Sequence, residues 1–304
     1  MIKYIGFLVI VLCFMIQNVY GQQQVMFTQY MYNYLAMNPA YAGSHETISA
    51  TALIREQWTG MEGAPSSQTF SIHSPINYQR MSLGLLVLND NIGVTNQTGI
   101  YASYAYRIPV SDKGKLSFGL QGGLSTYNAR FSEVSITDPT FSNGNIKEMH
   151  PNVGFGLYYN TSRLYAGIST PQLIQNIFDK SNPDSDSKIL RHYFTAVGYV
   201  FPLNRSLKLK PNVLIKMVDG APMQIDINAN LLIKEIVWIG FSWRSLDSID
   251  GLFQIQVTDQ LQFGYAYDFI TTTDLSRVNN GSHEIMLNYK FNFYKIRVIT
   301  PRYF

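Results

Sequence analysis

A regular alternation of apolar and other side chains constrains this chain more than any other feature. It is clearest in the second half, in 223–233, 261–269 and 282–293. Because successive side chains of a β-strand point to opposite faces of the sheet, the alternation predicts strands with one apolar and one polar face. The pattern predicts about 14 strands, at 47–58, 67–74, 81–89, 98–107, 115–127, 152–159, 163–170, 192–201, 206–217, 223–233, 236–245, 251–258, 261–269 and 282–293.

The lengths of these strands and of their connections indicate a membrane barrel. A tilted strand needs about 9–11 residues to cross a bilayer, and most of the predicted strands approach or exceed that length. The connections alternate between long and short, and 128–151, 171–191 and 270–281 are among the long ones. Bacterial outer-membrane barrels join their strands in this way, with long external loops and short periplasmic turns. The sequence therefore predicts an all-β, antiparallel transmembrane barrel in the cell outer membrane, in contact with its lipid.

The composition agrees with a bilayer on one face of the sheet. Only 14% of the residues are charged, whereas about a quarter are charged in a soluble domain. A soluble sheet with one wet face is the alternative, and it would carry more Lys and Glu on that face. The aromatic residues Trp58, Tyr104, Tyr106, Trp243 and Tyr289 near strand ends are typical of the girdles at the two membrane interfaces. Charged residues within the strands fall on the polar face: Arg107, Lys210, Lys216, Asp226, Arg244, Asp268 and Lys290.

The N-terminus has the pattern of an export signal. Lys3 precedes the apolar run 5–16, and Val19-Tyr20-Gly21 offers a cleavage site. A buried N-terminal helix is the alternative interpretation. Cys13, the one cysteine, lies within the signal, so the mature chain carries no disulfide. We predict a signal peptide at 1–21, a periplasmic or lumenal segment at 22–46, a barrel at 47–293 and a periplasmic tail at 294–304.

The sequence contains no convincing constellation for catalysis, and we expect no enzyme, cofactor or metal site. The five histidines have no metal-ligand spacing, and no nucleophile elbow or phosphate-binding loop is present. Ser71 and His73 lie two apart on one strand, but no third catalytic partner can be named. Asp184 and Asp186 are expected to be solvated rather than to bind a cation. The glycines between Gly119 and Gly123 are interpreted as a site of strand curvature.

Two further features bear on function. The net charge of +3 without clustered Lys and Arg excludes a nucleic-acid partner. In the connection 171–191, Leu173, Ile174, Ile177 and Phe178 recur at helical spacing and predict a short amphipathic helix. This helix would either narrow the barrel mouth or pack on the rim.

An ordered set of short motifs in the first 75 residues resembles the PorP/SprF family. These are outer-membrane proteins of the type IX secretion and gliding-motility machinery of Bacteroidetes. The segment Gly167-Ile168-Ser169-Thr170-Pro171-Gln172-Leu173 also resembles the family. The ordered motifs are Phe27-Thr28-Gln29-Tyr30-Met31, Asn38-Pro39-Ala40-Tyr41-Ala42-Gly43-Ser44, Arg55-Glu56-Gln57-Trp58-Thr59-Gly60, Gly63-Ala64-Pro65 and Thr69-Phe70-Ser71.

The resemblance implies a non-enzymatic role in the export or surface attachment of cargo such as large adhesins. The implied partners are periplasmic components of the secretion machine and the secreted adhesin itself. A passive or substrate-selective channel is the alternative function. The candidate residues either bind these partners or only close the barrel as a plug: Phe27, Tyr30, Tyr32, Asn38, Pro39, Tyr41, Gly43, Arg55, Trp58, Gly63, Pro65, Leu173, Ile177 and Phe178.

Overall fold

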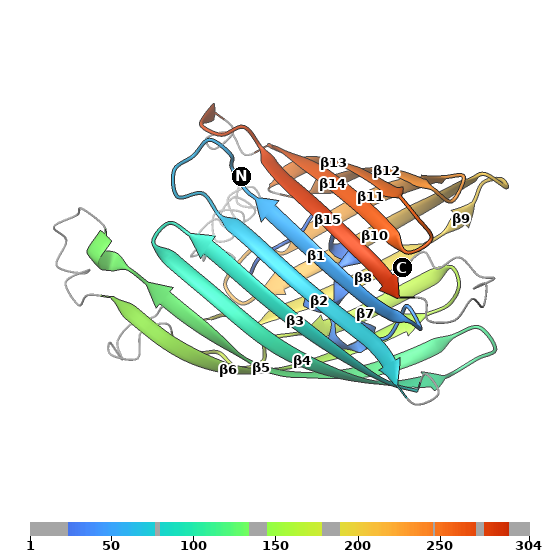
Figure 1. Cartoon of the computed structure of the whole chain (residues 1–304), viewed down its shortest axis with the longest axis horizontal. Coiled ribbons are helices and arrows are strands. Elements are labelled where there is room, and N and C mark those ends of the chain that lie inside the picture. The colour runs from blue at the N-terminus through green and yellow to red at the C-terminus, as the bar shows by residue number, and fades with distance from the viewer. Residues whose placement is uncertain are drawn as a thin grey trace, which may run out of the picture.

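The computed structural model of the chain is a closed antiparallel β-barrel (Figure 1). It describes residues 24–76, 80–133, 145–177, 189–245, 247–271 and 277–291. The strands follow one another around the barrel in sequence order. They are β1 (Ile48–Glu56), β2 (Ser66–Ile76), β3 (Met81–Ile92), β4 (Thr95–Pro109), β5 (Lys115–Ala129), β6 (Ile146–Asn160), β7 (Leu164–Thr170), β8 (His192–Tyr199), β9 (Phe201–Pro202), β10 (Leu207–Val218), β11 (Gln224–Ile233), β12 (Val237–Arg244), β13 (Ser248–Gln256), β14 (Leu261–Ile270) and β15 (Ser282–Phe291).

The sheet has no free edge among these strands. β1 pairs with β15 over nine residue pairs, from Ile48↔Phe291 to Glu56↔His283, and this pairing closes the barrel. The two-residue strand β9 continues β8 beyond Val200, and both pair with β10. Counted together, β8 and β9 are one strand of the barrel, which therefore has 14 strands. Closure matters in a membrane because each unpaired backbone group costs several kcal/mol in hydrocarbon. No helix within the described residues is long and apolar enough to cross a membrane.

The connections divide between the two ends of the barrel. We call one end the long-loop end, where the connections 57–65, 93–94, 130–145, 171–191, 219–223, 245–247 and 271–281 lie. We call the other the short-turn end, where the connections 77–80, 110–114, 161–163, 203–206, 234–236 and 257–260 lie. The wall formed by β4–β6, each strand of 15 residues, extends furthest at the long-loop end (Figure 1).

The two faces of the sheet differ as the alternation predicts. On β5, for example, Phe118, Leu120 and Leu124 are exposed on the outer face, whereas Ser117 and Gln121 are buried on the lumen side. Six of the seven charged strand residues named above are buried in the lumen, and Lys290, which is half-buried, lies on the same face. Four aromatic residues assigned to the girdles are exposed on the outer face: Tyr104, Tyr106, Trp243 and Tyr289. Tyr104, however, pairs with Leu120 in the middle of the apolar stretch of β4 and β5 rather than at its edge.

All the predicted strands are confirmed, although several are longer than the alternation indicated. β6 begins at Ile146 rather than at residue 152, and β4 begins at Thr95 rather than at residue 98. Trp58 lies just beyond β1, in the connection to β2. Neither the predicted signal peptide, 1–21, nor the tail, 294–304, is among the described residues.

The helix predicted in the connection 171–191 is wrong for residues 171–177, which form no helix. This segment instead lies along β6, where Leu173 N donates to Val153 O (2.9 Å). The Asn152 side chain donates to Pro171 O (2.8 Å), and Ile189 N donates to Asn176 O (2.8 Å). These long-range hydrogen bonds satisfy backbone groups without a helix, so the helical spacing of Leu173 and Ile177 does not decide the conformation.

A charge placed in the middle of the outer face tests which surface meets lipid. Leu120→Lys, at a position 60% exposed on β5, is expected to lower the free energy of unfolding in lipid vesicles by about 2–4 kcal/mol. Thr126→Lys, on the same face nearer the long-loop end, is the control and is expected to cost about 0–1 kcal/mol. Equal losses for the two variants would contradict the assignment of the lipid-facing band.

Candidate functional site

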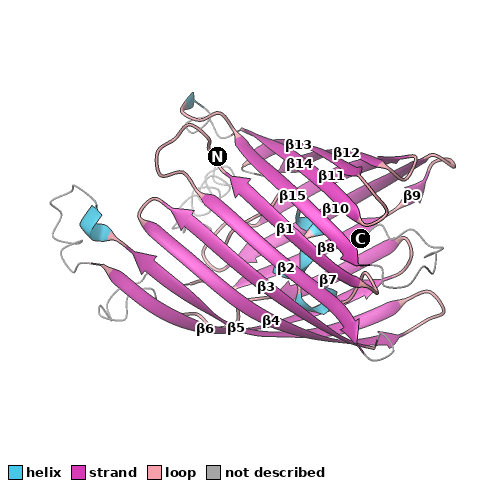
Figure 2. Cartoon of the chain, in the orientation of Figure 1, coloured by secondary structure: helices cyan, strands magenta, loops and turns pink. Residues whose placement is uncertain are grey.

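The lumen of the barrel is occupied by the chain's own N-terminal segment, residues 27–45, which we call the plug. It contains the short 3₁₀ turns η1 (Tyr30–Tyr32), η2 (Tyr34–Ala36) and η3 (Pro39–Tyr41), which lie within the barrel in Figure 2. All of its residues are buried except Tyr32, which is half-buried. Of the two locations considered for the segment 22–46, its described residues thus lie in the lumen.

The plug runs through the barrel from one end to the other. Thr28 contacts Glu284 and Asp268, which lie at the long-loop end of β15 and β14. Gly43 contacts His73, which lies near the short-turn end of β2. The chain therefore passes from the long-loop end to the short-turn end before it enters β1.

The Asn38-Pro39 pair shapes the centre of the plug. Asn38 has an extended backbone (φ −136°, ψ 109°), as the residue before a proline should. Its side-chain oxygen accepts a hydrogen bond from Ala40 N (2.9 Å) and so caps η3. Its amide nitrogen donates to Leu157 O on β6 (2.9 Å). One fully buried asparagine thus fixes both the local turn and its position against the barrel wall.

Three glycines on the lumen face make the space that this turn occupies. A Cβ on Gly119 would lie 2.1 Å from Ala40 N, and a Cβ on Gly156 would lie 2.1 Å from Asn38 Oδ1. On Gly167 it would lie 2.6 Å from the hydroxyl of Tyr34. These strand glycines therefore allow the plug backbone to approach the sheet closely. For Gly119 this replaces the sequence-based interpretation of strand curvature.

A cluster of tyrosine rings packs the plug against β6 and β7. Tyr34 lies edge-on to Tyr41 (centroids 5.5 Å apart) and to Tyr165 (6.0 Å), while Tyr158 is 5.4 Å from Tyr41. Such edge-to-face pairs contribute about 0.5–1.5 kcal/mol each beyond their burial. The hydroxyl of Tyr41 also lies 3.0 Å from His45 Nε2.

A buried ionic cluster holds the plug at the long-loop end. Arg55 on β1 forms ion pairs with Asp268 (2.6 Å) and with Glu284 (3.2 Å). Glu284 also accepts hydrogen bonds from Thr28 N (2.8 Å) and Gln29 N (2.7 Å), and Asp268 accepts one from the Thr28 hydroxyl (2.8 Å). The carboxylates thus bind the guanidinium of β1 and the backbone of the plug together, which compensates their burial.

A second arginine extends this cluster across the barrel wall. Arg244 on β12 forms an ion pair with Asp226 on β11 (Nε to Oδ2, 3.0 Å), and its Nη1 lies 3.9 Å from Asp268 Oδ2. Asn228, two residues along β11 from Asp226, donates to the hydroxyl of Tyr30 (3.0 Å). Lys210 lies 5.1 Å from the ring centre of Tyr32. Polar and charged groups of the wall therefore surround η1.

Ser71 and His73, the pair considered for catalysis, both bind the plug. The Ser71 hydroxyl donates to Asn33 Oδ1 (2.9 Å), and His73 Nδ1 accepts from Gly43 N (3.1 Å). Gly43 has a φ of 72°, and a Cβ there would lie 2.1 Å from the Ser82 hydroxyl. Both side chains thus position the plug. Within the described residues, no group of His, Cys, Asp or Glu has a geometry that could hold a metal ion.

The structure brings most of the candidate residues together. Phe27, Tyr30, Tyr32, Asn38, Pro39, Tyr41 and Gly43 form the plug, and Arg55 binds it. Trp58, Gly63 and Pro65 lie in the connection after β1, where Trp58 N donates to the Ser282 hydroxyl (3.2 Å). Leu173 and Ile177 lie along β6. Phe178 lies outside the described residues.

Sequence reasoning missed the residues that receive the plug. The parity of the strands placed Asp268 on the lumen face, but nothing in the sequence paired Asp268 or Glu284 with Thr28 or Arg55. The glycines at 119, 156 and 167 share that face, and small residues at lumen positions were the one available signal of a close backbone approach.

Substitution of a glycine beneath the plug should destabilise the barrel. Gly119→Ala is expected to lower the free energy of unfolding by about 1–3 kcal/mol, because its methyl group overlaps the backbone at Ala40. Gly122→Ala is the matched control on the same strand, since a Cβ there meets no atom within 4 Å, and it should change stability by less than about 0.5 kcal/mol. Urea titration in vesicles, followed by heat-modifiable gel migration, measures both. Similar losses of stability in the two variants would show that Gly119 does not make room for the plug.

Removal of the central arginine should cost more than removal of a partly exposed cation. Arg55→Met leaves two buried carboxylates without their guanidinium and is expected to cost about 3–5 kcal/mol. Lys115→Met, which removes the ion pair with Glu46 where Lys115 is 36% exposed, should cost less than about 1 kcal/mol. The same titration compares the two. A loss for Arg55→Met no larger than that for Lys115→Met would disprove the role given to the cluster.

Comparison with known structures places the fold among outer-membrane barrels. The structure is similar to that of the toluene transporter TbuX of Ralstonia pickettii, with a TM-score of 0.51 and 9% identity over 90% of this chain and 96% of that chain. It is also similar to the outer membrane protein Omp33 of Acinetobacter baumannii, with a TM-score of 0.48 and 8% identity over 81% of this chain and 98% of that chain. At these identities the likeness concerns the fold alone. No curated protein matches the chain.

The family comparison covers most of the chain. The family model described as "type IX secretion system membrane protein PorP/SprF" matches residues 19–289, a range that includes the plug and all but the last two residues of β15. The family suspected from the motifs is thereby confirmed. The chain belongs to the PorP/SprF family of type IX secretion system membrane proteins and is an outer-membrane β-barrel.

Proposed function

We propose that this protein is a plugged, non-enzymatic barrel that supports the export or surface attachment of type IX cargo, such as a large adhesin. In this role it binds the cargo, periplasmic components of the secretion machine, or both. The observation that carries the proposal is the occupied lumen, in which residues 27–45 contact the wall from the long-loop end to the short-turn end. A barrel filled in this way is suited to anchor partners at its ends.

The density of contacts around the plug supports an anchoring role over conduction. The two clusters of buried apolar side chains both combine plug residues with wall residues: Tyr34 with Tyr158 and Tyr165 in one, and Phe27 with Leu53 and Met286 in the other. The plug also shares a buried ionic cluster with three strands. Displacing it would expose these apolar surfaces and leave Asp268 and Glu284 without the donors of Thr28, both of which are unfavourable.

Conductance distinguishes the anchoring role from the channel alternative. The purified wild-type protein in planar bilayers should show no steady ohmic current, because the plug fills the lumen. A variant that lacks residues 27–42 serves as the positive control, once its heat-modifiable migration shows that it is folded, and it should conduct. A steady current through the wild-type protein would favour a channel instead.

A deletion strain tests the role in secretion directly. Loss of the gene should strip one or more type IX adhesins from the cell surface while the permeability barrier of the outer membrane stays intact. Complementation with the wild-type gene or with Gly122→Ala should restore the adhesin, as measured by surface immunolabelling and by cargo in whole-cell extracts. If all type IX cargo reached the surface at wild-type levels without this protein, the proposal would be wrong.

A further inference from the structure

The outer face of β2–β6 changes from apolar to polar over two rows of side chains towards the long-loop end. The strand register groups the outward side chains into rows that cross the sheet. The last apolar row is Phe70, Val87, Ile100, Leu124 and Pro151. The next row is Gln68, Asn89, Thr98, Thr126 and Met149. The row beyond it, which we call the amide row, is Ser66, Asn91, Asn96, Asn128 and Lys147.

The amide row lies just above the layer of phospholipid headgroups, at a depth that the sugars of a larger glycolipid headgroup would reach. From Ile100 to Asn96 the strand advances about 13 Å, and a tilt of about 35–45° reduces this to about 10 Å along the membrane normal. The headgroup layer adds about 5–7 Å to each side of the hydrocarbon. The side chains one row beyond the apolar band therefore lie within this layer, and those of the amide row lie just above it.

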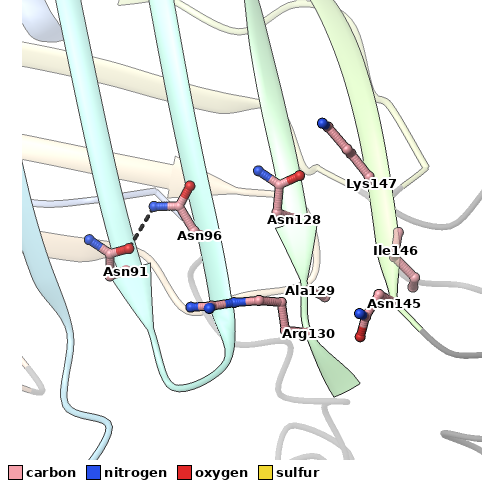
Figure 3. Close-up of a pocket in the computed structure, with 8 residues that line it drawn as sticks. All are labelled: Asn91, Asn96, Asn128, Ala129, Arg130, Asn145, Ile146 and Lys147. Atoms are coloured by element: carbon pink, nitrogen blue, oxygen red, sulfur yellow. Dashed lines mark hydrogen bonds between the residues drawn. The ribbon is translucent and has the colours of Figure 1, made fainter. Parts of the chain in front are cut away.

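A cavity of about 490 Å³ opens on this face, around the outer ends of β3–β6. Figure 3 shows Asn91, Asn96, Asn128 and Lys147 side by side on four neighbouring strands, with Arg130 and Asn145 nearer the tips. Among the described residues, the cavity is lined by four asparagine side chains and two cationic side chains, without a carboxylate. Its chemistry is that of a site for an anionic, hydroxyl-rich ligand.

Part of this lining is already fixed in place. Asn96 Nδ2 donates to Asn91 Oδ1 (2.6 Å) and to Asn89 Oδ1 (2.9 Å), and Asn89 Nδ2 donates to Gln68 Oε1 (2.8 Å). The side chains of Asn128 and Lys147, in contrast, make no hydrogen bond or ion pair with the described part of the chain. The hydrogen-bonded amides of Gln68, Asn89, Asn91 and Asn96 are already ordered, so binding a ligand there costs less conformational entropy. The amide of Asn128 and the ammonium of Lys147 beside them are available to the ligand.

We propose that this cavity binds the phosphorylated saccharide headgroup of a glycolipid in the outer leaflet. Lys147 and Arg130 contact the phosphate, and the asparagine amides donate to and accept from the sugar hydroxyls. Three observations on the barrel lead to this assignment: the amide row lies just above the headgroup layer, the described lining of the cavity has no carboxylate, and an apolar row two rows below would contact the acyl chains. A free anionic glycan has the same headgroup chemistry but lacks the chains.

Binding to the purified full-length barrel in detergent tests the proposal, with lipid A as the probe. Asn128→Ala/Lys147→Gln should weaken lipid A binding about tenfold or more, because it removes a charge-assisted contact and an amide. Lys234→Gln, an exposed lysine at the short-turn end, is the matched control and should bind as the wild type does. Native mass spectrometry and a fluorescence titration give the bound fraction and the affinity.

Other ligands separate the possible sources of the headgroup. Phosphatidylglycerol and glucosamine 1-phosphate should each bind at least about tenfold more weakly than lipid A, since one lacks the sugars and the other the chains. Equal affinity for glucosamine 1-phosphate would mean that the site takes a free glycan, and equal affinity for phosphatidylglycerol would mean that it does not recognise the saccharide. Either result, or unchanged lipid A binding by the double variant, overturns the proposal. A photo-crosslinker at Asn128 that captures a protein rather than a glycolipid in intact cells would do so as well.

Discussion

The pairing of β1 with β15 is the constraint on which the rest of the structure depends. Within hydrocarbon every backbone donor and acceptor needs a partner, so a sheet of this kind is stable there only when it closes on itself. The nine residue pairs from Ile48↔Phe291 to Glu56↔His283 provide that closure. Closure then defines an interior whose polar side chains are cut off from bulk water and need partners of their own.

The plug supplies many of those partners, and the wall in turn supplies the partners of the plug. Backbone amides at Thr28 and Gln29 satisfy Glu284, and the amide at Gly43 is satisfied by His73. The relation is therefore closer to that of a core and its shell than to that of a ligand and its site. Segments this interdependent are expected to unfold as one cooperative unit rather than in separate steps.

The fold was largely predictable from the sequence, because strand alternation is a local signal. Each strand was predicted from the alternation of its own residues. The inward position of Arg107, Lys210 and Asp226 followed from their place in that alternation alone. The plug could not be derived in the same way. Thr28 meets Glu284 across 256 residues of sequence, and nothing local to either residue indicates the other. The resemblance to the family drew attention to the right residues without saying what they contact.

Two interpretations from local pattern did not foresee a tertiary contact. The spacing of Leu173, Ile174 and Ile177 fits a helix, yet this segment forms no helix and makes hydrogen bonds to β6 and to Ile189 instead. The glycines near Gly119 fit strand curvature, yet the space above Gly119 is filled by the backbone of Ala40. In both cases a tertiary contact determines a feature that local pattern assigns otherwise.

The ionic cluster at the long-loop end has a consequence for how the barrel is assembled. Arg55 belongs to β1, Asp268 to β14 and Glu284 to β15, so the cluster spans the seam between the first strand and the last. A barrel that closed with the plug left outside would bury these carboxylates without the donors of Thr28 and Gln29. Completion of the seam is thus more favourable when the first-made part of the chain is enclosed by the last-made strands. The cluster acts as a thermodynamic check that a finished barrel contains its plug.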